Sequence, residues 1–205
     1  MSEPFDASHI GGDVAAFGEQ CKAQALAGIA ADDWRDVYEW TKSWISSGGG
    51  GYLPDAWLVY AVSGLLHKQP RTAVHTIDMA LQTWIGGTAD RAALTWCRGL
   101  LILNHLSDPS TALLDLEDAH PSLPHWLSAG STEALESCRE AASRSRKKKA
   151  SVPPRPEYDL PLHRGVFSPG ASGLAAFAPD VSVRCDGDEP DVWPTVAPFF
   201  YAQPN

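Results

Sequence analysis

Seven histidines have the widest chemical range in this sequence of 205 residues, because an imidazole can bind a metal or transfer a proton near neutral pH. His120 and His125 are the closest pair, five residues apart, with Pro121 and Pro124 between them. No cysteine pair or carboxylate cluster accompanies them at the spacing of a zinc site. We interpret them as loop histidines and expect neither a metal nor a cofactor.

Motifs for nucleophilic attack or phosphate binding are also missing from the sequence. The small residues of 168–173 contain no Gly-x-Ser-x-Gly elbow. The glycines of 48–51 are not followed by the Lys-Ser/Thr of a phosphate loop, and Gly11-Gly12 lacks the dinucleotide-binding spacing. We therefore expect a protein that is not an enzyme. A small enzyme with a site between helices and a C-terminal arm stays open as a third hypothesis.

Charged side chains form two groups that could bind a partner. Asp115 and Asp118 share one face of a predicted helix, whereas Glu117 lies elsewhere. This group is either a solvated acidic face or a negative patch that receives a basic segment of a partner. The second group is a basic run, made of Arg144, Arg146, Lys147, Lys148 and Lys149.

The basic run suggests two interpretations. Cations at a helix end can contact nucleic-acid phosphates, so a subunit of a nucleoprotein complex is our second hypothesis. The protein is acidic, however, with a net charge of -9, which argues against a general nucleic-acid binder. A solvated helix end that leads into a linker is the simpler interpretation.

Periodicity and capping signals predict seven helices in front of a C-terminal arm. Asp13 and Thr88 are expected caps, and Pro54, Pro70 and Pro109 suit first helical turns, where a missing N–H costs nothing. We expect a flexible joint at 48–51, since four glycines sustain neither helix nor strand. The predicted helices run from about 14 to 30, 34 to 46, 54 to 67, 70 to 86, 88 to 106, 109 to 120 and 131 to 147.

A short pattern occurs twice between Pro54 and Ala119, at an offset of 39 residues. Matched pairs are Trp57 with Trp96, Pro70 with Pro109, Thr72 with Thr111, Ala73 with Ala112 and Ala80 with Ala119. We assign the two tryptophans to the core. A repeated helical hairpin explains the pattern better than an irregular bundle with a chance internal match.

The repeat resembles the tetratricopeptide repeat, best over 54–119 and weakly over 14–46. In that family an aromatic residue begins the first helix and small alanines line the second, so that helices approach closely. The period of 39 exceeds the usual 34, and Gly64 lies where the family prefers an aromatic residue. The resemblance implies an all-α fold, a right-handed stack of about three helical hairpins with a terminal helix.

We divide the chain into a leader at 1–12, a helical-repeat domain at 13–147 and a Pro-rich arm at 148–205. We predict no helical period for the arm and expect it to be extended and mostly non-regular, with one short strand at 181–183. Its aromatic end favours docking, either on its own helical body or on another subunit, and the sequence leaves both open. The docking candidates are Trp193, Phe199, Phe200 and Tyr201.

Our leading hypothesis is a non-enzymatic adaptor or complex subunit that binds a protein partner through the repeat surface and the arm. Candidate binding positions on the helices lie one turn from the core tryptophans, at Tyr60, Ser63, Thr95 and Arg98. Four widely spaced cysteines favour reduced thiols and a cytoplasmic protein. No apolar run is long enough to cross a membrane, so we expect no membrane contact.

Overall fold

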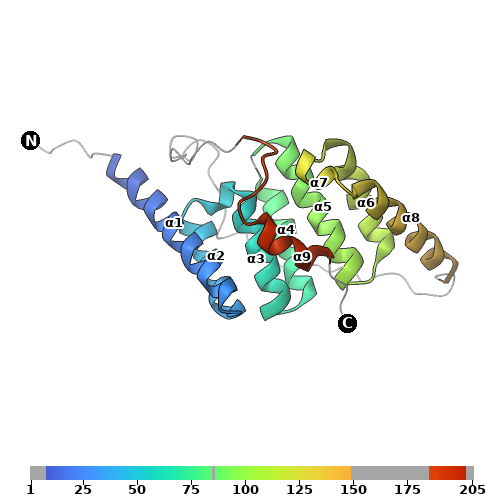
Figure 1. Cartoon of the computed structure of the whole chain (residues 1–205), viewed down its shortest axis with the longest axis horizontal. Helices are drawn as coiled ribbons and strands as arrows, with labels where there is room; N and C mark the ends of the chain where they lie inside the picture. The colour runs from blue at the N-terminus through green and yellow to red at the C-terminus, as the bar shows by residue number, and fades with distance from the viewer. Residues whose placement is uncertain (1–7, 85, 149–184, 202–205) are drawn as a thin grey trace, which may run out of the picture.

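The computed structural model describes residues 8–84, 86–148 and 185–201, and within these ranges the regular structure is helical, with no β-strand (Figure 1). Successive helices pack against each other and form a stack of three hairpins, which α8 extends against α6. This confirms the predicted all-α fold class. The hairpins are α1 (Ser8–Ala30) with α2 (Trp34–Ser47), α3 (Pro54–His67) with α4 (Pro70–Thr83), and α5 (Thr88–His105) with α6 (Pro109–Ala119).

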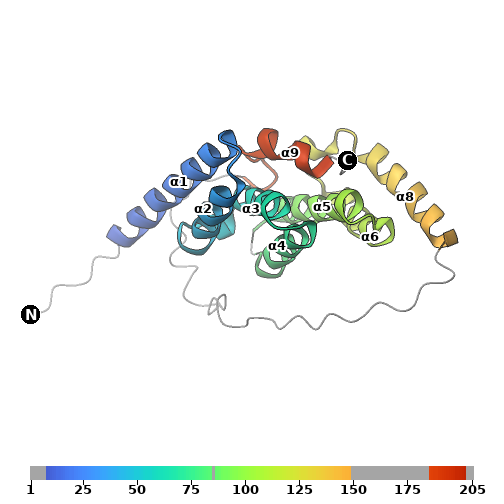
Figure 2. The same ribbon diagram turned by 90° about the horizontal axis from the view of Figure 1, so that it is seen from below.

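The remaining elements of the described residues are two 3-10 turns and three further helices. A 3-10 turn at Gly50–Tyr52 precedes α3, and a second one at His120–Ser122 precedes the single-turn helix α7 (His125–Ser128). The terminal helix α8 spans Ser131–Lys148, and α9 spans Trp193–Tyr201. Figure 2 shows α9 over α3 and α5, with α1 on one side of it and α8 on the other.

The repeated tryptophans and alanines lie in the core of the stack, and the sequence predicted this for the tryptophans. Trp57 is 5% exposed and Trp96 is fully buried, while the four repeated alanines of α4 and α6 are at most 1% exposed. Small side chains on the second helix of each hairpin let the first helix approach closely, and the bulkier residues fill the space that remains. The hairpins at 54–119 are therefore packed by the residues that recur in the sequence.

Helix starts follow local chemistry at several predicted positions. The Asp33 carboxylate accepts a hydrogen bond from the Asp36 N–H at the start of α2, and Asp108 does the same for Thr111 at the start of α6. Pro54 and Pro109 occupy first turns, where a proline is tolerated. Asp13, an expected cap, lies inside α1, which begins at Ser8. Glycines at 11 and 12 cost about 1 kcal/mol each, which weakens a helix without ending it.

The four-glycine run is a packed turn, and the expectation of a flexible joint is wrong. A β-carbon placed on Gly48 would lie 2.8 Å from the Cα of Gly18, so α1 approaches the end of α2 too closely for a side chain. Gly50 is buried against Trp44 and Ala56. The absence of side chains therefore allows α1 to contact the end of α2 within the first hairpin, and it allows Gly50 to pack between α2 and α3.

The expectation that residues 151–205 have no helical period is also wrong at the C-terminal end. The segment 193–201 forms α9, although it contains Pro194 and Pro198. Pro194 lies in the first turn, where its missing N–H is harmless, and packing against the body supports the rest. The strand expected at 181–183 lies outside the described residues. The division into leader, repeat domain and arm stays a prediction, although residues 8–12 belong to α1.

Candidate functional site

The α9 helix lies against α3 and α5, and we call the surface beneath it the α3–α5 face. Val196 and Phe200 are fully buried there, and Trp193 is 7% exposed. Their spacing of three and four residues places them on one stripe of a helix. The aromatic end of the chain therefore docks on its own helical body, which was one of the two alternatives left open by the sequence.

Aromatic contacts hold both ends of α9. The Trp193 ring lies 4.8 Å from the Trp126 ring of α7 in an edge-to-face arrangement, and it stacks on Phe200 at 5.7 Å. The Phe199 ring meets the Trp34 ring of α2 edge-on at 5.2 Å. Such pairs stabilise by roughly 0.5–1.5 kcal/mol beyond their buried area. Tyr201 remains 46% exposed at the rim.

Two side chains at the end of α5 bind the main chain of α9. Asn104 donates from Nδ2 to the Phe200 carbonyl at 2.7 Å, and His105 Nε2 lies 2.8 Å from the Phe199 carbonyl. A carbonyl only accepts, so this contact requires the tautomer with the proton on Nε2. The last carbonyls of a helix have no partner within the helix, and these two side chains satisfy them.

The segment in front of α9 supplies the cap of α5. The Asp186 carboxylate accepts hydrogen bonds from the backbone N–H of Ala89 at 3.2 Å and of Asp90 at 2.9 Å. Gly87 is the residue before the helix and provides no side chain, so the expected cap by Thr88 is wrong. A carboxylate suits this position because a helix N-terminus carries partial positive charge.

Further contacts fix this segment along its length. The Gly187 N–H donates to the Asp90 carboxylate at 3.3 Å, and Trp126 Nε1 donates to the Gly187 carbonyl at 3.1 Å. Lys22 Nζ of α1 forms an ion pair with Asp191 at 2.8 Å, and the buried Asp55 of α3 accepts from the Val192 N–H at 3.4 Å. Residues 186–200 are thus bound by side chains from α1, α2, α3, α5 and α7.

Three of the four predicted binding positions on the helices do not present a side chain to a partner. Tyr60, Ser63 and Thr95 are at most 9% exposed. The hydroxyls of Ser63 and Thr95 donate to backbone carbonyls of their own helices. Burial and a hydrogen bond with Tyr38 raise the pKa of Tyr60. The central helices α3 and α5 are covered on several sides, so a residue one helical turn from a core tryptophan is still buried.

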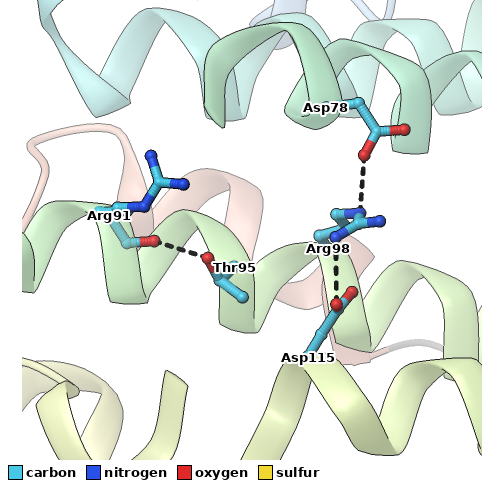
Figure 3. A network of polar contacts seen from close by, with 5 residues as sticks. All are labelled: Asp78, Arg91, Thr95, Arg98 and Asp115. Carbon is cyan, nitrogen blue, oxygen red and sulfur yellow. Dashed lines mark hydrogen bonds and ion pairs between the residues drawn. The ribbon is translucent and has the colours of Figure 1, made fainter. Parts of the chain in front are cut away.

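Arg98, the fourth position, joins α5 to both neighbouring outer helices (Figure 3). Its Nε lies 2.8 Å from Asp78 of α4, and one terminal nitrogen lies 3.0 Å from Asp115 of α6. Burial raises the pKa of Asp115 to about 6, and Arg98 opposes this rise. Burial also raises the pKa of Asp78. We call these three residues the Arg98 cluster, and it ties the second hairpin to the third.

The remaining charged candidates are divided between neighbours within the chain. Asp115 is buried, whereas Glu117 and Asp118 are exposed, and Glu117 pairs with Arg139 of α8 at 3.0 Å, so the acidic group is not one solvated face. In the basic run, Arg144 pairs with Glu140 at 2.8 Å. The backbone of residues 146–148 belongs to α8, and Lys149 lies outside the described residues.

Sequence reasoning missed the residues that fix α9 and the segment in front of it on the helical body. Asn104, His105 and Asp186 carry no local motif, because their partners lie between 94 and 97 residues away. The helix itself was detectable, since Trp193, Val196 and Phe200 follow helical spacing. The prolines concealed this signal.

Within the described ranges, no three histidine, cysteine, aspartate or glutamate side chains form a group that could hold a metal ion. None of the helices in these ranges combines the length and apolar character that spanning a bilayer requires. Comparisons with protein-family models, with curated proteins and with solved structures find no match for this chain.

Proposed function

We propose that the chain is a non-enzymatic, tetratricopeptide-like adaptor that binds a helical segment of a protein partner on its α3–α5 face. The observation that carries the proposal is α9, a nine-residue helix held on that face as a peptide ligand would be. Helix-in-groove recognition uses buried anchors at spacings of three and four residues, which Trp193, Val196 and Phe200 provide here.

The polar groups of the face also support binding rather than catalysis. Asn104 and His105 contact carbonyls at a helix end, and the N-terminus of α5 receives a carboxylate. These groups are spread along a bound segment, whereas catalysis needs them to converge on one reacting atom. The four cysteines, all free, support placing the adaptor in the cytoplasm, where thiols stay reduced.

The experiment is a pulldown from cell extract with the full-length chain and variants of the α3–α5 face. We expect a stoichiometric protein partner of the Phe200→Ala chain, in which α9 is loosened, and we expect its recovery to fall at least about tenfold when Asn104→Ala and His105→Ala are added, since two hydrogen bonds to the ligand are lost. The matched control removes an amide and an imidazole from the exposed surface of α4, with Gln82→Ala and His75→Ala.

Two results would count against the adaptor. One is a folded Phe200→Ala chain that recovers no stoichiometric protein, and the other is a partner that is lost equally with the control variant. Recovery of nucleic acid instead, sensitive to salt and to Lys147–Lys149→Ala, would replace the adaptor with the nucleoprotein hypothesis.

A further inference from the structure

We propose that the partner segment resembles residues 186–200 of this chain: an Asp-Gly turn followed by a helix with Trp, Val and Phe at the positions equivalent to 193, 196 and 200. In this proposal α9 competes with the partner for the same face. This inference rests on the proposed function and names the chemistry of the partner. The contacts of the α3–α5 face select each part of such a segment separately.

The face favours an Asp-Gly pair because of the room beside Gly87 and Ala89 as well as the partial positive charge at the start of α5. A β-carbon on Gly87 would lie 1.9 Å from the Asp186 carboxyl carbon, so the carboxylate fills the place of a missing side chain. Gly187 has a φ of +86°, a conformation that favours glycine, and its β-carbon would lie 3.0 Å from that of Ala89. A ligand with another residue at either position loses the turn.

The helical part is selected by burial along one stripe. Phe200 and Val196 are fully buried, while Thr195 and Pro198 on the same helix are exposed. Trp193 packs against Trp126 and requires a large aromatic residue there. The exposed positions of a partner helix can vary freely.

Asn104 and His105 select for where the bound helix ends and not for its side chains. They bind two successive carbonyls, those of Phe199 and Phe200, which a longer uninterrupted helix would use internally. The partner helix therefore ends near the residue equivalent to Phe200.

The same contacts show why α9 can be displaced. Pro198 lies inside α9 and has no N–H to donate, so one helical hydrogen bond is missing from the bound segment. Its side chain is exposed and contributes little to the contact. A partner helix without this proline keeps the buried anchors and avoids the penalty.

The test measures binding of a fluorescein-labelled synthetic peptide of residues 185–201 to the full-length chain by anisotropy. A chain carrying Phe200→Ala has lost the main anchor of its own α9, so we expect it to bind the peptide at least about tenfold more tightly than wild type does. The peptide carrying Pro198→Ala should bind the same chain about tenfold more tightly than the unmodified peptide.

Variants of the face and of the peptide check the selectivity. Adding Gly87→Ala to the Phe200→Ala chain should weaken peptide binding at least about fivefold, because the new methyl group occupies the place of the peptide's Asp186 carboxylate. The control is Gly51→Ala, whose β-carbon meets its nearest neighbour at an ordinary 3.4 Å. A peptide with Asp186→Ala should lose affinity for the Phe200→Ala chain but bind equally with or without Gly87→Ala.

The inference is overturned if the Phe200→Ala chain, folded by circular dichroism, shows no saturable binding, or binds a scrambled peptide equally well. If that chain does not fold, the chain with Asp186→Ala and Asp191→Ala takes its place, since both side chains are exposed and fix the segment in front of α9, Asp186 at the start of α5 and Asp191 on Lys22. Failure of the peptide to bind leaves the pulldown to decide the adaptor. Loss of the pulldown partner with the control variant rejects the adaptor whatever the peptide does.

Discussion

The α3–α5 face and the Arg98 cluster both join the second hairpin to the third, by different physical means. The cluster uses three charged side chains that belong to the stack itself, on α4, α5 and α6. The face uses aromatic rings and hydrogen bonds to main-chain groups to hold a segment from the far end of the chain. A charge removed from the cluster leaves a desolvated ion behind, whereas a ligand removed from the face leaves groups that water can satisfy. The cluster should therefore stay closed, whereas the proposed partner binding requires the face to exchange its ligand.

The largest expected effect is on the docking of α9. Phe200→Ala removes a fully buried phenyl ring, and such truncations cost about 3–5 kcal/mol when the site cannot collapse. We expect amide hydrogen exchange in α9 to accelerate by about a hundredfold or more, while exchange in α4 and α6 stays unchanged.

Equal acceleration in α4 and α6 would show that α9 unfolds only together with the stack. The comparison would then fail, because the face would be as permanent as the cluster. Thr195→Ala is the matched control, since it truncates an exposed side chain on the same helix.

The next effect concerns the cluster. Arg98→Ala leaves Asp78 and Asp115 without their shared cation, and we expect a loss of about 3 kcal/mol in the free energy of unfolding, measured in urea at neutral pH. Arg139→Ala breaks the exposed pair with Glu117 and should cost less than about 1 kcal/mol. If both variants lose the same stability, the cluster is an ordinary surface ion pair.

A pH dependence separates the cluster from the face more sharply. The pKa of Asp115 is raised from 3.8 to about 6, so the folded state binds this proton more tightly than the unfolded state does. Stability from this group is therefore highest below about pH 4 and falls as the pH rises through 6, by about 2 kcal/mol after discounting for partial exposure.

The variant Asp115→Asn imitates the protonated form and isolates this dependence. The difference in unfolding free energy between wild type and the variant should change by about 2 kcal/mol between pH 4 and pH 7, and wild type should become less stable relative to the variant as the pH rises. A difference that is constant over this range would show that Asp115 has an ordinary pKa. Peptide binding to the face should be the same in both chains.

The same contrast explains what the sequence could predict. Helix starts at Pro54, Pro109 and Asp33 depend on neighbours within four residues, and the buried tryptophans depend on a pattern that occurs twice, so both were predictable. The Arg98 cluster depends on three helices meeting, and the fit of Asp186 to α5 depends on residues about 97 apart. No local propensity encodes such contacts, and the prolines of α9 argued against a helix that packing supports.

The smallest expected effect tests whether the face binds main-chain groups as a ligand site does. Asn104→Ala removes the hydrogen bond to the Phe200 carbonyl, and because Asn104 is only half-buried, water can take the place of its amide. We expect a loss of about 1 kcal/mol in α9 docking, seen as about fivefold faster hydrogen exchange there. Gln82→Ala, an exposed amide on α4, should change it by no more than about 0.5 kcal/mol. A loss as large as that of Phe200→Ala would mean that Asn104 supports the stack itself, because a bond replaceable by water cannot equal a buried ring.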